Sequence, residues 1–194
     1  MARTKAFDQE KVLEKALHIF WRDGYDATSM SKLVKELGIS RSSIYDTFGD
    51  KRALFLASLN AYRQQSSEML IKTLKVHPDP KRALHEMLET AMRQTAKDPE
   101  RKGCFMANTS VELSSYDQEI LDLSKENKER VIDAFTQAIR RGQRTGDISK
   151  KFPATQLAEF IYAAYNGLQV VGKFDPDLKK LKQTVKIALS VLEE

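Results

Sequence analysis

The 194-residue sequence has few of the residues that disulfides, metal sites and catalytic sites require. It contains one cysteine, Cys104, and three histidines. One cysteine excludes an internal disulfide and leaves no spaced ligand set for zinc. There is no glycine-rich phosphate loop and no Gly-x-Ser-x-Gly motif, and the run His85-Glu86-x-x-Glu89 lacks the second histidine of a zinc-protease helix. We therefore expect a protein that is not an enzyme and has neither cofactor nor metal.

Long apolar runs are also missing. A membrane-spanning helix needs about 18 or more consecutive apolar residues, and no run approaches that length. The N-terminal stretch MARTKAFDQEK has no apolar centre, so it does not match a secretory signal. Together with the single cysteine, these features predict a protein of the reducing cytoplasm that makes no membrane contact.

Positive charge is present but is not concentrated. The net charge is +5 and the pI is about 9.2. Residues 1–54 contain ten Lys and Arg against eight Asp and Glu, so they contribute only +2. This net charge is compatible with nucleic-acid binding, but it does not show which part of the chain would bind. The binding segment must be identified from the spacing of particular residues.

Apolar residues recur at helical spacing along the whole chain, and no stretch shows the alternation of a strand. The expected fold class is all-α with about nine helices. Glycine and proline breaks separate the helices, which we expect at about 8–23, 30–37, 41–48, 51–74, 81–96, 103–113, 117–144, 153–172 and 178–192. We place an N-terminal three-helix domain at 1–50 and a helical effector-binding and dimerisation domain at 51–194. Pro153 suits the first turn of its helix.

The stretch from Thr28 to Lys51 has the most specific pattern. Apolar residues occupy one face of a first helix, and Gly38 follows it at a position that suits a left-handed cap. A short second helix is capped by Ser40 and ends at Gly49. A helix, a glycine-containing turn and a short helix form a helix-turn-helix, in which the second helix enters the major groove of DNA. The apolar positions of the two helices are Met30, Leu33, Val34 and Leu37, then Ile44, Tyr45 and Phe48.

Spaced positions across three helices resemble a known family. The run Gly38-Ile39-Ser40 is followed by Ile44-Tyr45-x-x-Phe48-x-x-Lys51-x-x-Leu54, and Gly24-Tyr25-x-x-Thr28-Ser29 precedes it. This pattern is similar to the DNA-binding domain of the tetracycline-repressor (TetR) family over about residues 8–60. Members often carry His and Tyr after the motif tyrosine, where this chain has Asp46 and Thr47. We expect Asp46 to point away from phosphate or to accept a hydrogen bond from cytosine.

The motif predicts eight residues that contact DNA. Arg41 can bond a guanine edge or a phosphate, and the serines that follow it are short donors for bases. The helix starts at Ser29 and Lys51 suit phosphate. The resemblance implies that Tyr45 and Lys51 touch the DNA backbone. The alternative is that the hydroxyl residues only cap helices and that Tyr45 is half core. The DNA-binding candidates are Thr28, Ser29, Arg41, Ser42, Ser43, Tyr45, Thr47 and Lys51.

The last two helices predict a homodimer through about residues 153–192. They carry more apolar surface than one face of a small domain needs, and Ala163, Ala164 and Gly167 would let two helices approach closely. The resemblance implies that these helices pair across a two-fold axis. One recognition helix covers few base pairs, so we expect a dimer on palindromic double-stranded DNA. The alternative is that this face packs on the other helices of the same chain.

The resemblance also implies a cavity for an unknown small-molecule effector in the C-terminal helices. Each candidate lining residue has the alternative of being ordinary core. Cys104 follows Arg101-Lys102-Gly103 at a helix start, where cations and helix amides stabilise a thiolate. The Gly-Cys-Phe run is similar to one in redox-responsive members, although a free cysteine is usually a small buried hydrophobe. The effector-binding or sensing candidates are Cys104, Phe105, Asn108, Tyr116, Phe135, Tyr162, Tyr165 and Asn166.

These observations together predict a DNA-binding transcriptional regulator. We expect a repressor that leaves a palindromic operator when an effector binds or when the thiol is modified, with the fourth helix carrying the change. The alternative is a small-molecule-binding or scavenging protein with a vestigial helix-turn-helix. Salt-dependent preference for one DNA sequence over random DNA separates the two.

Overall fold

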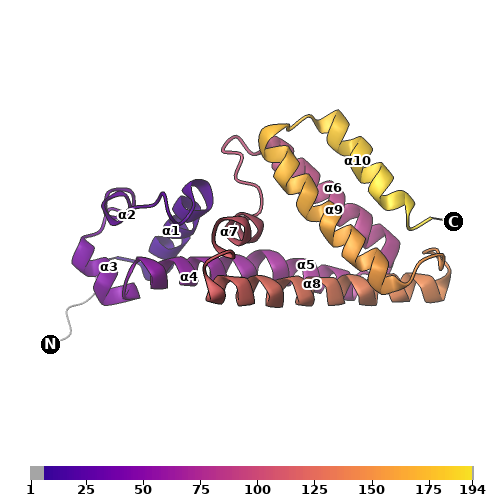
Figure 1. Ribbon diagram of the computed structural model, residues 1–194, viewed down its shortest axis with the longest axis horizontal. Helices are drawn as coiled ribbons and strands as arrows, with labels where there is room; N and C mark the ends of the chain where they lie inside the picture. The colour runs from indigo at the N-terminus through magenta and orange to yellow at the C-terminus, as the bar shows by residue number, and fades with distance from the viewer. Residues whose placement is uncertain (1–6, 194) are drawn as a thin grey trace. The chain divides into compact units, whose positions relative to one another are not determined.

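The computed structural model describes residues 7–193, and that range contains helices and no strand (Figure 1). The expected all-α fold is confirmed. The helices α4, η1 and α5 follow one another without a break, and η1 is a π-helix. If these three are counted as one continuous helix, residues 7–193 contain the expected number of about nine helices. The helices are α1 Gln9–Asp23, α2 Met30–Leu37, α3 Arg41–Phe48, α4 Lys51–Tyr62, η1 Arg63–Ser67, α5 Glu68–Val76, α6 Pro80–Lys97, α7 Phe105–Leu113, α8 Gln118–Thr145, α9 Ala154–Phe174 and α10 Leu178–Ser190.

The chain divides into two compact units that meet between Gln64 and Gln65. This division lies later than the boundary we placed after residue 50, because α4 packs against α1. The rings of Phe20 and Phe55 meet edge to face with centroids 5.2 Å apart, and those of Trp21 and Tyr62 are 4.9 Å apart. Burial of these aromatic rings joins α4 to the first unit.

Local capping defines the helices of the first unit. Ser29, Ser40 and Asp50 each accept a backbone N–H bond from three residues further on, at the starts of α2, α3 and α4. Gly38 ends α2 with φ of 70°, a left-handed conformation that favours glycine. The expected turn geometry is therefore present. The large apolar side chains that are fully buried at the centre of the unit are Phe20, Leu33, Ile44, Leu54, Phe55 and Leu59.

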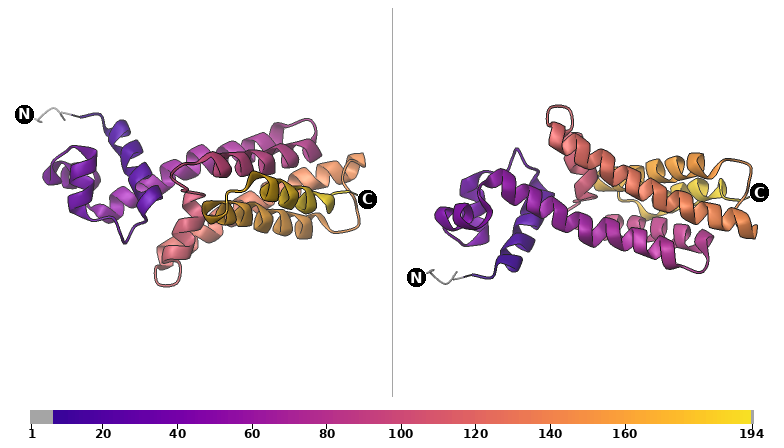
Figure 2. Two further views of the ribbon diagram at one scale, coloured as in Figure 1. Left: turned by 90° about the horizontal axis from the view of Figure 1, so that it is seen from above. Right: turned by 90° about the horizontal axis from the view of Figure 1, so that it is seen from below.

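The second unit is a helical bundle. Helix α8 packs against α5 and α6, α9 packs on α6 and α8, and α10 covers α6 and α9, as Figures 1 and 2 show from three directions. Its core includes Leu84, Leu88, Met92, Phe135 and Ile161. Pro153 precedes α9 as its N-cap instead of lying in the first turn, since the helix begins at Ala154.

A side chain of α8 holds the end of α5. Arg141 donates to the carbonyl oxygens of Leu74 and Lys75, both at 2.6 Å. These carbonyls belong to the last turn of α5, where no intrahelical partner is available. Arg141 therefore fixes the point at which the chain leaves α5 for α6.

Candidate functional site

The surface of α3 presents polar side chains to solvent. Arg41 and Ser42 are exposed, and Tyr45 is 43 % exposed. The Arg41 guanidinium lies 5.8 Å from the centroid of the Tyr45 ring, a cation–π geometry that keeps both groups on one face. The Ser40 hydroxyl lies 2.9 Å from that of Ser42 and 2.8 Å from that of Ser43. This face combines one cation, an aromatic hydroxyl and short hydroxyl donors.

The first unit also contains the N-termini of α2 and α4, two helices that pack against α3. Ser29 at the start of α2 is exposed and caps the helix through Lys32 N at 3.1 Å. At the start of α4, the Lys51 ammonium lies 4.1 Å from the centroid of the Tyr25 ring. Helix N-termini and a nearby cation form favourable positions for phosphate oxygens. Ser29, Arg41, Ser42, Tyr45 and Lys51 all lie in the first unit with at least partly exposed side chains, and Ser43 and Thr47 of α3 are half-buried.

Thr28 differs from the other DNA-binding candidates. Its side chain is fully buried, and its hydroxyl donates to the carbonyl oxygen of Gly24 at 2.6 Å. A buried hydroxyl with a backbone partner has no surface to offer a phosphate. Thr28 therefore fixes the turn before α2, whereas Ser29 is the residue that caps this helix. Asp46 is exposed on α3.

The effector candidates lie in different environments. Phe105 and Phe135 are fully buried core residues, whereas Tyr116 is 65 % exposed in the turn after α7, so Tyr116 does not line an interior cavity. Asn108 accepts from the Lys173 ammonium at 3.1 Å and donates to the Lys102 carbonyl at 2.7 Å. It also borders an open hollow of about 580 Å³. Asn166 donates to the Tyr162 carbonyl at 2.9 Å within α9.

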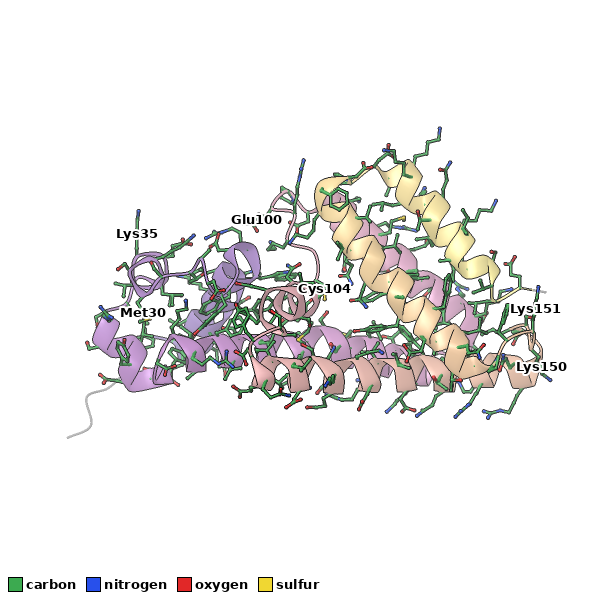
Figure 3. All side chains as sticks on the ribbon, in the orientation of Figure 1. Met30, Lys35, Glu100, Cys104, Lys150 and Lys151 are labelled. Atoms are coloured by element: carbon green, nitrogen blue, oxygen red, sulfur yellow. The ribbon has the colours of Figure 1, made fainter. Side chains whose placement is uncertain are left out.

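Cys104 is buried and is the N-cap of α7 (Figure 3). Its sulfur accepts a hydrogen bond from the backbone N–H of Ala107 at 3.5 Å. Tyr162 and Tyr165 are its neighbours on α9. Burial, and then the charge of a Cys104 thiolate, raise the pKa of both hydroxyls above their usual range. The three residues therefore form a partly desolvated cluster in the second unit.

The second unit contains a cavity of about 350 Å³ in the C-terminal helices, where the resemblance implied one, but most of its lining residues are not the ones expected from the sequence. Of the eight effector candidates, only Tyr165 lines it. The other lining residues come from the end of η1, from α5 and from α6. They are Gln65, Ser66, Met69, Leu70, Thr73, Leu74, Ala83, Glu86, Met87, Thr90, Ala91 and Gln94.

Helices α9 and α10 leave large apolar side chains exposed. Phe160, Val170 and Val171 are 41–45 % exposed, and Phe174 is 69 % exposed. Gly167 lies between them with no atom within 4 Å of the position that a Cβ would take. We call this surface of α9 the α9 stripe, and it is defined by Phe160, Ala163, Gly167, Val170, Val171 and Phe174.

Residues 7–193 contain neither a candidate metal site nor a candidate membrane span. No group of three or more His, Cys, Asp or Glu side chains could hold a metal ion there. No helix in the described range is both long and apolar enough to cross a membrane.

Known proteins resemble the chain along its length. The family model described as "Bacterial regulatory proteins, tetR family" matches residues 12–58, and "Tetracyclin repressor-like, C-terminal domain" matches residues 80–188. The chain is 30% identical to the uncharacterized HTH-type transcriptional regulator YezE of Bacillus subtilis, over 100% of both chains. It is 27% identical to the HTH-type transcriptional repressor ComR of Escherichia coli, over 99% of this chain and 92% of ComR.

A solved structure shows the same arrangement in the presence of DNA. The TetR family regulator CifR, as a cysteine mutant complexed with 26-base-pair operator DNA, superimposes with a TM-score of 0.87. It is 25% identical, and the match covers 98% of this chain and 100% of that one. These similar proteins are named as transcriptional regulators and not as enzymes.

Proposed function

The chain belongs to the tetR family of bacterial regulatory proteins, and we propose that it is a homodimeric repressor that binds a palindromic operator through α3 of each subunit. It is a DNA-binding transcriptional regulator. The observation that carries the proposal is the exposed polar face of α3, with Arg41 over the Tyr45 ring, in a helix that packs against α2 and α4. A regulator of this kind works on DNA in the cytoplasm.

The proposed contacts divide into two classes. Arg41 and Ser42 face bases in the major groove, where an arginine can bond both acceptors of a guanine. Ser29, Tyr45 and Lys51 bond phosphates and set the register of α3 on the duplex. Phosphate contacts release counterions, so affinity for the operator falls as salt rises. Blocking of the promoter by the bound dimer then represses transcription.

The proposed dimer pairs the α9 stripe and α10 of two subunits. Phe160, Phe174 and Ile187 are large apolar side chains that are 45–70 % exposed, and burial of such surface contributes about 25 cal/mol per Å². Ala163 and Gly167 are small enough for two copies of α9 to pack closely. A two-fold dimer presents two copies of α3, which matches a palindromic site.

The proposed release has two routes, a small-molecule effector and modification of Cys104. Cys104 is 9 % exposed, and its neighbours on α9 are Tyr162 and Tyr165. Addition of even one oxygen or carbon group to the sulfur would enlarge a packed site and shift these helices. Release requires that the modified or liganded protein favours the conformation that does not bind DNA.

Capture of genomic DNA fragments tests the proposal. The wild-type chain and Cys104→Ser would each select fragments in reducing buffer and after treatment with a thiol oxidant. We expect a recovered palindrome in reducing buffer, its loss from wild type on oxidation, and its persistence in Cys104→Ser. Recovery of random fragments only would remove the repressor proposal. A palindrome that both proteins retain after oxidation would leave the repressor and remove the thiol route.

A further inference from the structure

The cavity of about 350 Å³ in the second unit is large enough for an organic ligand. An engineered apolar cavity of about 150 Å³ takes up benzene, so this cavity has room for a molecule of roughly twice that size. Its apolar lining comes from both long sides, α5 and α6, and includes two methionines, whose flexible side chains adapt to different ligand shapes. The apolar lining residues are Met69, Leu70, Leu74, Ala83, Met87, Ala91 and the ring of Tyr165.

The polar lining is almost entirely uncharged. Gln65, Ser66, Thr73, Thr90 and Gln94 offer amide and hydroxyl groups. These side chains can donate to and accept from hydroxyl, carbonyl or amide groups of a ligand.

The one charged lining residue is already paired. An oxygen of Glu86 accepts from Arg82 Nε at 2.7 Å, and the other lies 3.8 Å from His77 Nε2. A ligand anion would meet this carboxylate with no cation in the lining, and a ligand cation would have to displace Arg82. The lining offers amide and hydroxyl partners but no free partner for a charged group, so it suits an uncharged molecule better than an ion.

The cavity also touches an unusual part of the backbone. Gln65 and Ser66 are the lining residues from η1, the π-helix of Arg63–Ser67, and the two units meet within that turn. A π-helix uses i→i+5 bonds and is rare, and short π segments inside α-helices occur frequently at functional sites. A return to i→i+4 bonding rotates the helix before the turn relative to the helix after it. A ligand that contacts Gln65 and Ser66 therefore acts on the turn that joins α4 to α5.

We propose that this cavity binds an uncharged amphiphile, an apolar body that carries hydroxyl, carbonyl or amide groups, and that occupancy changes operator affinity through the π-helical turn. The inference rests on the proposed function, because it names the site and ligand class of the effector. The cavity is a different site from Cys104, which does not line it, but the two share a neighbour in Tyr165.

Methyl NMR of the methionines tests the site without DNA. The chain has six methionines, of which Met69 and Met87 line the cavity and Met30, Met92 and Met106 do not. The probes are 4-phenylbutan-1-ol, 4-phenylbutanoate and 4-phenylbutylammonium, which share one apolar body. We expect the alcohol to shift the Met69 and Met87 signals saturably, and both charged probes to bind at least about tenfold more weakly. Shifts at other methionines only, or equal binding of all three probes, would overturn the proposal.

A matched pair of variants localises the binding. Thr90→Trp places a large ring in the cavity from an exposed position on α6, so it should not disturb the core. His85→Trp makes the same change at an exposed position of α6 that does not line the cavity. We expect Thr90→Trp to weaken binding of the alcohol at least about tenfold and His85→Trp to leave it unchanged. An equal effect of both variants would place the alcohol elsewhere.

The same proteins then test the coupling to DNA. Operator affinity is measured with and without saturating 4-phenylbutan-1-ol. We expect the alcohol to change the affinity of wild type and His85→Trp about tenfold, and that of Thr90→Trp by less than twofold. Binding of the alcohol with no change in operator affinity would remove its effector role. Absence of any specific DNA binding, with the alcohol still bound at Met69 and Met87, would instead remove the proposed function and leave the ligand site.

Discussion

Gly167 offers a test in which chain stability and dimerisation change in opposite directions. It lies inside α9, and a Cβ at this position would meet no atom within 4 Å apart from its chain neighbours and the backbone of its own helix. Glycine inside a helix is less favourable than alanine by about 0.8–1.0 kcal/mol, and leucine is close to alanine. Gly167→Ala and Gly167→Leu should therefore each stabilise the monomer by about 0.8 kcal/mol, which corresponds to a rise in Tm of about 2–4 °C.

In the proposed dimer, Gly167→Leu has the opposite effect: the leucine that stabilises the monomer should destabilise the dimer. If two copies of α9 meet at Gly167, an added isobutyl group overpacks the contact at a cost of about 1–3 kcal/mol. The two-fold axis repeats the cost, so the dimer loses about 2–6 kcal/mol, and its dissociation constant rises by at least about thirtyfold. The methyl group of Gly167→Ala should have a much smaller effect, which makes it the matched control.

Two measurements separate these effects. Sedimentation velocity over a concentration series gives the dimer dissociation constant of each variant. Thermal unfolding at a concentration where each protein is monomeric gives the stability of the chain itself, since dimerisation would otherwise contribute to Tm. A Gly167→Leu protein as dimeric as wild type would refute the assignment of the α9 stripe to the interface. A lower monomer Tm for this variant would refute the open environment of Gly167.

Three further predictions follow from individual contacts. In Gly172→Ala the new Cβ would lie 2.4 Å from Thr95 Cγ2, a clash that costs about 1–3 kcal/mol and exceeds the gain of about 1 kcal/mol from alanine in a helix, so chemical denaturation should show a net loss of up to about 2 kcal/mol, and Thr95→Ser in the same protein should restore most of it. Arg141→Ala removes two bonds to α5 carbonyls, so the unfolding free energy should fall by about 1–2 kcal/mol; unchanged hydrogen exchange near the end of α5 would contradict this. Burial, and then Cys104, raise the pKa of Tyr165 in the folded state. Its contribution to stability should be complete below pH about 10 and fall as pH rises further, whereas Tyr165→Phe should lack that part of the fall.

Local signals explain why much of the first unit could be predicted. Ser29, Ser40 and Asp50 cap helices as their residue types favour, and Gly38 has the positive φ expected after an apolar helix face. Each signal depends on residues within one or two turns, so the sequence alone contains it. The boundary after residue 50 missed the end of the unit because contacts such as that of Trp21 with Tyr62 join residues far apart in sequence.

The cavity needed information that local patterns do not contain. Met69 and Thr73 lie on α5, and Met87 and Thr90 lie on α6. Helical periodicity predicts which face of each helix is buried, but it does not predict which other helix that face packs against. The π-helical segment Arg63–Ser67 has the composition of an ordinary exposed helix, so no sequence signal separates it from α4 and α5. Tyr116 shows the converse error, since an aromatic residue was expected inside and is exposed in a turn.

Operator binding by Arg41→Ala tests the central claim that α3 recognises a specific DNA sequence. Fluorescence anisotropy would compare the recovered operator with a scrambled duplex over a series of salt concentrations. Arg140→Ala is the control, because Arg140 is an exposed arginine on α8 of the second unit. We predict that wild type and Arg140→Ala prefer the operator, and that Arg41→Ala loses about 1–3 kcal/mol of operator affinity. Equal affinity of wild type for both duplexes, or an unchanged Arg41→Ala, would contradict the account.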